Sequence, residues 1–201
     1  MKYPYLGFDP ESFDSLFNTT RTQVELEKFL LFAICVAGKT SPTTANSLNK
    51  LFETTVGTLP MATLAYDENT AAKLKSVGIG CYNQRMRSIE SYVEWSKDHK
   101  LRGASLEDLL KIKGVSHKTA RFFLLYNYQF QAYAAIDTQI LKVLRSKGYD
   151  APKTTPTSFK QYKYWEDVFL FEAITNDGAQ FVEGDFYARK DFDGWIAGRA
   201  M

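Results

Sequence analysis

The sequence predicts an all-α protein, and three observations support this prediction. Apolar residues recur at helical spacing in one segment after another, and capping residues or glycines bound many of these segments. No stretch alternates strongly between apolar and polar residues, although residues 129–136 are compatible with an extended segment. The chain has 201 residues, 45% of them hydrophobic and 15% aromatic, which is enough for one large domain or for two small ones that share a core.

The first half of the chain is predicted to form a series of helices. They are segments with helical spacing of apolar residues, and they span residues 11–37, 43–52, 61–66, 70–77 and 83–97. Asn18, Thr19 and Thr20 predict a break inside the first segment, and the two glycines of residues 78–80 predict a turn before the last one. Cys35 lies in an apolar run and is expected in the core.

The next segment is predicted to form a helix, a tight turn and a second helix. Ser105 begins an N-terminal capping signature, and Leu106 and Leu109 belong to the buried stripe of the first helix. Gly114 ends that helix, and Ser116 is placed to cap the second one. Backbone N–H groups at such a turn form an anion site that suits a DNA phosphate.

Lys118 stands in an unusual place, the first turn of the second helix. A cation there opposes the helix dipole at a cost of about 0.3–1 kcal/mol. A partly desolvated lysine loses its proton more easily, and a neutral amine is a nucleophile. Asp137 opens a third helix, over residues 138–147, that ends at Gly148. Two simpler interpretations stay open: Lys118 pairs only with a phosphate, and Asp137 only caps its helix.

The remaining third of the chain is predicted to hold a loop over residues 151–157 and helices over 158–174 and 185–197. The first of these helices is rich in aromatic residues. Among them, Tyr162 and Trp165 are candidates for the walls of a pocket for a flipped base. Packing of the helix core is the alternative, and it is the better interpretation for most of the aromatic residues.

At the turn and at Asp137 the chain resembles the helix-hairpin-helix DNA glycosylase superfamily, of the endonuclease III and 8-oxoguanine DNA glycosylase type. In that family the hairpin reads Leu-Pro-Gly-Val-Gly-x-Lys-x-Ala, and a Val-Asp-Thr-His segment follows. Here residues 112–120 read Ile-Lys-Gly-Val-Ser-His-Lys-Thr-Ala, and residues 136–139 read Ile-Asp-Thr-Gln. The resemblance implies that Lys118 is the Schiff-base lysine and Asp137 the catalytic aspartate. Lys113 replaces the proline of the family, and Ser116 replaces the second glycine.

The resemblance covers about residues 24–147 and implies a two-lobed helical DNA glycosylase fold. The expected domains are a helical barrel over residues 24–134, with the helix-hairpin-helix at about 105–127, and a second lobe of residues 1–23 plus 135–201. This second lobe is expected to pack across the active-site cleft. The resemblance also implies that Lys39 fills the hole left by the extruded base. It implies as well that Cys81, in a segment similar to the Gly-Leu-Tyr-Asn-x-Lys turn of the family, lies where a wedge enters the base stack.

The expected DNA-binding residues lie at the hairpin and at the two candidate wedges. They are Lys113, Gly114, Val115, Ser116, His117, Arg121, Lys39, Cys81, Asn83 and Arg85. The net charge of +2 does not by itself indicate nucleic acid. The basic residues at the hairpin, however, have no acidic neighbour between Asp108 and Arg121, and this cluster is the expected site of the DNA backbone.

No metal and no other cofactor is expected. Several members of the family carry an iron–sulfur cluster on four cysteines near the C-terminus, whereas this chain has no cysteine after Cys81. The two histidines, His99 and His117, are far apart, which argues against a zinc site. The longest apolar run, residues 29–37, is too short to cross a membrane, and no secretion signal is visible. We expect a monomer that binds double-stranded DNA in the cytoplasm, near the nucleoid, or in a nucleus.

The function expected from the resemblance is that of a bifunctional DNA glycosylase and abasic-site lyase. Such an enzyme flips an oxidised base, 8-oxoguanine or an oxidised pyrimidine, out of duplex DNA and excises it with a lysine nucleophile. Two alternatives stay open. One is a glycosylase-fold enzyme that acts on a natural or hypermodified base, and the other is a non-catalytic helix-hairpin-helix module that binds DNA through its backbone.

Overall fold

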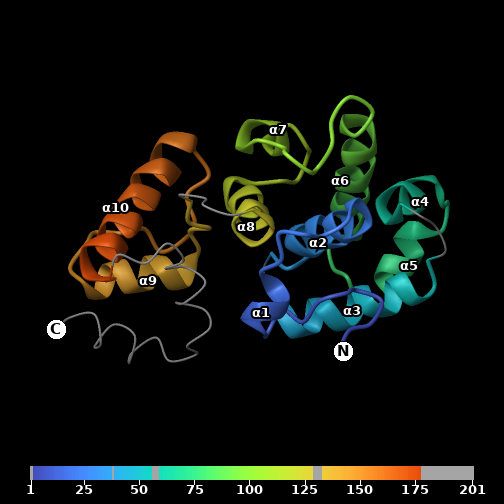
Figure 1. Ribbon diagram of the computed structural model, residues 1–201, viewed down its shortest axis with the longest axis horizontal. Coiled ribbons are helices and arrows are strands. Elements are labelled where there is room, and N and C mark those ends of the chain that lie inside the picture. Colours follow the sequence, from blue (N-terminus) through green and yellow to red (C-terminus); the bar gives the residue numbers. More distant parts are fainter. Residues whose placement is uncertain (1, 38, 56–58, 129–132, 178–201) are drawn as a thin grey trace. The chain divides into compact units, whose positions relative to one another are not determined.

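The protein is all-helical in the part that the structure describes (Figure 1). The computed structural model describes residues 2–37, 39–55, 59–128 and 133–177. The helices are α1 (Phe13–Leu16), α2 (Gln23–Cys35), α3 (Ser41–Glu53), α4 (Pro60–Tyr66), α5 (Thr70–Ser76), α6 (Tyr82–Trp95), α7 (Leu106–Leu110), α8 (His117–Asn127), α9 (Thr138–Ser146) and α10 (Phe159–Asp177). These bounds confirm the predicted helices; the one predicted over residues 185–197 lies outside the described residues.

Contacts divide the chain into two compact units, with the boundary between Val115 and Ser116. In the first unit, α2 packs against α3, α4 and α6, and α6 also packs against α4 and α5 (Figure 1). Helix α2 begins with a capping box in which Thr22 and Glu25 satisfy one another's backbone N–H groups. Its apolar residues, Cys35 among them, are buried, as expected for the central helix of a core.

A buried carboxylate joins three helices of the first unit. Glu27 of α2 accepts a hydrogen bond from the backbone N–H of Met61 at 3.0 Å, which caps the start of α4. Its other oxygen accepts from the hydroxyl of Tyr92 on α6, at 2.9 Å. Burial raises the pKa of Glu27 above its usual value, and the hydrogen bonds from Met61 and Tyr92 oppose that rise. The core of this unit therefore contains a polar contact that responds to pH.

The N-terminal residues pack on the first unit. Backbone N–H groups of Tyr5 and Leu6 donate to the Asn49 side chain of α3, at 2.9 and 3.1 Å. The ring of Phe8 lies 5.0 Å from that of Phe29 on α2. Residues 1–23 are predicted from the sequence to belong to the second lobe. In the structure, residues of this segment instead contact α2 and α3. The arrangement of two lobes across a cleft stays a prediction.

The second unit is built on α9 and α10, which lie side by side (Figure 1). Its core consists of the apolar face of α9 packed against buried aromatic residues of α10, and it includes Ile140, Leu141, Leu144, Tyr162 and Phe169. Asp137 caps α9 at its N-terminus. Residues 133–136, which are not helical, lead into this cap.

Candidate active site

The turn after α7 lies against α6, within the first unit. The backbone N–H of Lys113 donates to the Ser91 hydroxyl at 2.9 Å. Gly114 has φ +83°, and a Cβ added there would overlap the hydroxyl of Ser88 and lie 3.3 Å from its Cβ. Both the backbone conformation and the close approach to α6 therefore require glycine at this position. Val115, the next residue, is buried.

Helix α8 opens with free backbone donors. Its N-cap, Ser116, accepts a hydrogen bond from the N–H of Thr119 at 3.2 Å, as its position predicts. Within the described part of the chain, no hydrogen bond uses the backbone N–H groups of Ser116, His117 and Lys118. These three donors, together with the positive end of the helix dipole, give α8 the properties of an anion site.

The structure brings Lys118 and Asp137 together, although 18 residues separate them along the chain. Nζ of Lys118 lies 3.5 Å from Oδ2 of Asp137, and the two side chains are 35% and 16% exposed. The other oxygen of Asp137, Oδ1, accepts from the N–H groups of Gln139 and Ile140 at 2.8 and 3.0 Å. The carboxylate therefore caps α9 with one oxygen and faces the lysine with the other.

Arg121, which was expected to contact DNA, is instead buried. Its side chain is 1% exposed and forms a two-point ion pair with Glu166 of α10, at 2.6 and 2.9 Å. The guanidinium also lies over the ring of Tyr162, 4.5 Å from its centroid. A cation that is buried, paired and stacked in this way is not available to a phosphate. The sequence pattern missed this role because Glu166 lies 45 residues further along the chain.

Tyr162, which was expected to line a base pocket, instead lies in the core. The residue is fully buried (0% exposed), and its hydroxyl donates to the carbonyl oxygen of Ala134 at 3.1 Å. Trp165 is half-buried and packs against the core between α9 and α10. An exposed aromatic residue that the sequence did not single out, Phe159, lies at the start of α10 with its ring 5.6 Å from that of His117.

His117 is half-buried beside aromatic rings rather than standing freely at the surface. Its ring lies 5.4 Å from that of Tyr162, and Nδ1 is 3.4 Å from a guanidinium nitrogen of Arg121. Burial, and next the charge of Arg121, lower the pKa of His117 below its usual value. The guanidinium can only donate, so Nδ1 faces it as an acceptor and the neutral ring carries its proton on Nε2.

The two candidate wedge residues lie on neighbouring turns of the first unit. Nζ of Lys39 donates to the carbonyl oxygen of Gly78 at 2.5 Å, and its Cε would lie 3.6 Å from a Cβ added at Gly80. Cys81 follows directly, exposed and with φ +53°, at the N-cap of α6. Nothing in the sequence pattern indicated that the turn of Lys39 and the turn before Cys81 lie next to each other.

The remaining predicted DNA-binding residues lie at the start of α6 and at the hairpin. Asn83 is exposed, and Lys113 is exposed on the turn after α7. Arg85 is half-buried, and its Nε is buried without a hydrogen-bond partner among the described residues. Whether these side chains contact DNA stays a prediction.

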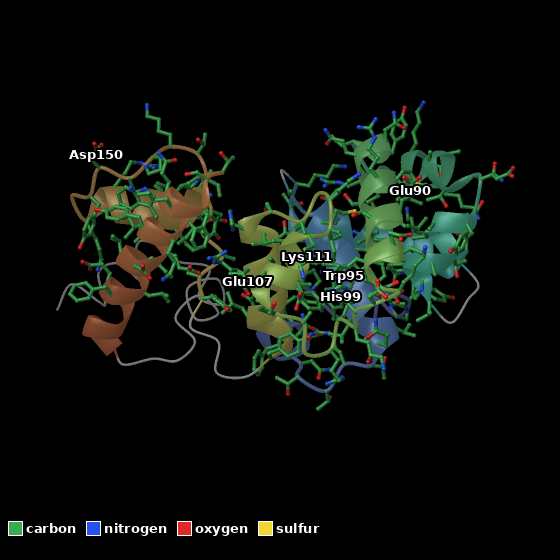
Figure 2. All side chains as sticks on the ribbon, turned by 90° about the horizontal axis from the view of Figure 1, so that it is seen from above. Glu90, Trp95, His99, Glu107, Lys111 and Asp150 are labelled. Carbon is green, nitrogen blue, oxygen red and sulfur yellow. The ribbon has the colours of Figure 1, made fainter. Side chains whose placement is uncertain are left out.

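One basic residue of the hairpin cluster is engaged by an acidic neighbour. Nζ of Lys111 donates to Asp108 at 2.8 Å, and this bond, with those from Ser105, lowers the pKa of Asp108 to about 2. The same oxygen of Asp108 lies 3.9 Å from Nε2 of His99. The ring of His99 stacks on Trp95 at the end of α6, 4.9 Å between centroids (Figure 2). This cluster joins α7 to the C-terminal end of α6.

In the described ranges, no three His, Cys, Asp or Glu side chains are grouped so that they could bind a metal ion. Across the same residues, no helix combines the length and the apolar character that a membrane span requires.

Comparison with known proteins identifies the fold. No protein-family model and no curated protein sequence matches the chain. Eleven chains of solved structures are similar to it. One is the 8-oxoguanine DNA glycosylase of Thermotoga maritima, with 22% sequence identity and a TM-score of 0.64, covering 84% of this chain and 79% of that one. The chain therefore has an all-helical DNA glycosylase fold, as its sequence predicts.

Proposed function

We propose that this protein is a bifunctional DNA glycosylase and abasic-site lyase that uses Lys118 as its nucleophile. The observation that carries the proposal is the 3.5 Å approach of Nζ of Lys118 to Oδ2 of Asp137. Amine and carboxylate come from different helices of a glycosylase fold, at the positions that the family motif assigns to them. A module that only binds the DNA backbone needs a cation at this place but no carboxylate facing it.

The chemistry follows from the two groups. The neutral amine of Lys118 forms a bond to C1′ of the sugar while the bond from C1′ to the base breaks. The electron pair of that bond leaves with the base, which takes up a proton. The Asp137 carboxylate stabilises the positive charge that develops on the sugar. The bond between C1′ and O4′ then breaks, O4′ takes up one of the two protons of the nitrogen, and the C1′=N double bond of a protonated Schiff base forms on Lys118. Loss of a proton from C2′ then expels the 3′ phosphate and cuts the strand.

Binding of duplex DNA is proposed to begin at the start of α8. The N–H groups of Ser116, His117 and Lys118 have no partner among the described residues and suit a phosphate oxygen. Lys113, exposed on the turn before this helix, adds a positive charge. Lys39 and Cys81, on their two adjacent turns, are proposed to fill the gap left by the extruded nucleotide. We expect the protein to do this as a monomer and without a cofactor.

The proposed substrate is an oxidised base, 8-oxoguanine or an oxidised pyrimidine. A lysine nucleophile that also cuts the strand is associated with oxidative lesions in the family that the hairpin resembles. The similar structure from Thermotoga maritima is that of an 8-oxoguanine DNA glycosylase, which favours 8-oxoguanine as the first base to test.

The test is covalent trapping with borohydride, which reduces a Schiff base to a stable amine. Purified protein is incubated with duplexes that carry 8-oxoguanine, thymine glycol, uracil, an abasic site or only normal bases. We expect trapped protein–DNA complexes and strand cutting on the abasic duplex and on at least one oxidised base. Lys118→Gln should abolish both while DNA affinity stays within about twofold, since backbone contacts are spread over many groups.

Each other outcome identifies a different function. Binding to every duplex without trapping or base release would leave the non-catalytic DNA-binding module. Activity only on an unmodified or a hypermodified base would favour the glycosylase-fold enzyme that processes such bases. Trapping by Lys118→Gln at the rate of the unchanged protein would assign the nucleophile to another amine.

A further inference from the structure

The backbone of Ala134 is held on both sides by residues of α10. Its N–H donates to Oε1 of Glu166 at 2.9 Å. Its carbonyl oxygen accepts from the Tyr162 hydroxyl at 3.1 Å and from the N–H of Ile136 at 2.9 Å. Ala134 and Ile136 are fully buried, so these bonds are shielded from water. The two side chains of α10 thus fix a tight turn that ends one residue before Asp137.

The same carboxylate also fixes the helix that carries Lys118. Glu166 accepts two bonds from the guanidinium of Arg121, and Arg121 lies three residues after Lys118 on α8. Residues three apart on a helix lie on the same side of it. Glu166 therefore connects, through one side chain, the helix of the candidate nucleophile and the turn that leads to the candidate carboxylate.

We propose that Glu166, Arg121 and Tyr162 are positioning residues that hold Asp137 against Lys118. The inference rests on the proposed function, since it concerns the same two groups. Residues 133–136, which lead to Asp137, form no helix. Its cap on α9 sets the direction of Oδ1, whereas the bonds to Ala134 set where the start of α9 lies relative to α8.

The proposal predicts a loss of rate rather than of binding. A displacement of about 1 Å between reacting groups costs up to roughly a hundredfold in rate. None of the three positioning side chains is placed to contact DNA, since Glu166 and Arg121 are 1% exposed and Tyr162 is fully buried. Removing a hydrogen bond of these positioning residues should therefore slow base excision while DNA affinity stays nearly constant.

Tyr162→Phe is the decisive variant, because it removes one hydroxyl and keeps the ring that packs against Arg121. We expect its single-turnover excision rate to fall by about tenfold, within the range that misplacement produces, and its affinity for the duplex to change by less than about twofold. In the Asp137→Asn background the same substitution should change the rate by less than about twofold, because groups that act through one another are not additive.

Tyr92→Phe is the matched control. It also removes a buried tyrosine hydroxyl with a hydrogen bond to the protein, but it lies in the first unit and touches Glu27. We expect it to keep the excision rate of the unchanged protein. Glu166→Gln should slow excision more than Tyr162→Phe does, since it leaves the guanidinium of Arg121 buried without its counter-ion. If that variant fails to fold, the cycle with Tyr162→Phe still decides the question.

The outcomes separate this inference from the proposed function. If the unchanged protein excises bases and Tyr162→Phe does so equally fast, the Tyr162 hydroxyl has no positioning role. An equal loss in both Asp137 backgrounds, or an equal loss in Tyr92→Phe, would also overturn it. If the unchanged protein excises no base and gives no trapped complex, the proposed function fails and the inference fails with it.

Discussion

Replacing Gly114 by alanine tests how the hairpin is fixed on α6. The substitution adds one methyl group at a residue with φ +83°, where it would overlap the hydroxyl of Ser88 and lie 3.3 Å from the Ser88 Cβ. Ser88 cannot turn away freely, since it is buried and its hydroxyl donates to the carbonyl oxygen of Gln84 at 3.0 Å. Two separate costs therefore arise from one methyl group.

The magnitude is the sum of these costs. A side chain in the left-handed region costs about 1–2 kcal/mol. Forcing a methyl group into a packed contact costs about 1–3 kcal/mol. Gly114→Ala should therefore lower the free energy of unfolding by about 2–5 kcal/mol, a large fraction of the roughly 5–15 kcal/mol that holds a folded protein together.

Urea unfolding followed by circular dichroism measures this free energy of unfolding. The Gly114→Ala substitution is made both in the unchanged protein and in a Ser88→Ala background. Ser88→Ala removes the hydroxyl that the methyl group would overlap and leaves the contact at 3.3 Å. In that background Gly114→Ala should cost only about 1–2 kcal/mol, the part that comes from the backbone conformation. An equal cost in both backgrounds would refute the close contact with Ser88 as a cause.

Three further predictions concern the site and the core. Asp137→Asn keeps an oxygen for the cap on α9, so its free energy of unfolding, measured by thermal unfolding, should change by well under ~1 kcal/mol. The measured base-excision rate should fall about 10²–10³-fold, as it does when an enzyme loses one charge-stabilising group. A fully active variant would leave Asp137 only its capping role. Alanine at Lys39 or Cys81 should slow excision from duplex DNA more than from single strands in a side-by-side rate assay, and equal losses would argue against a wedge. Burial raises the pKa of Glu27, so the folded protein binds this proton more tightly than the unfolded chain and loses stability as the pH rises through that pKa. The free energy of unfolding of Glu27→Gln, measured in urea relative to the unchanged protein, should therefore increase as the pH rises above the usual pKa of glutamate. An equal increase in the exposed Glu90→Gln would contradict this.

The helices were predictable because the signals that set them are local. Asn18, Thr19 and Thr20 predict a break, and the structure ends α1 before them and begins α2 after them. Ser105 and Ser116 are the observed N-caps of α7 and α8. Capping bonds reach only three residues along the chain, so residue types and spacing contain the information that places them.

The site was only partly predictable, because its supporting contacts are not local. Lys118 and Asp137 could be paired from a motif that fixes their types and spacing. The bonds of Ala134 to Tyr162 and Glu166 span 28 and 32 residues, and no periodicity links these positions. An aromatic or acidic residue on α10 shows helical spacing whether it faces a pocket, the core or solvent, so the pattern cannot assign its partner.

The ion pair of Arg121 changes how the hairpin is expected to bind DNA. Of the basic residues at the hairpin, Arg121 is paired with Glu166, Lys111 is bonded to Asp108, and His117 has a lowered pKa that favours its neutral form. A net charge of +2 for the whole chain provides little additional attraction at long range. In the proposed complex, the backbone N–H groups are then the more important phosphate ligands, because they are fixed by the fold and remain donors at every pH.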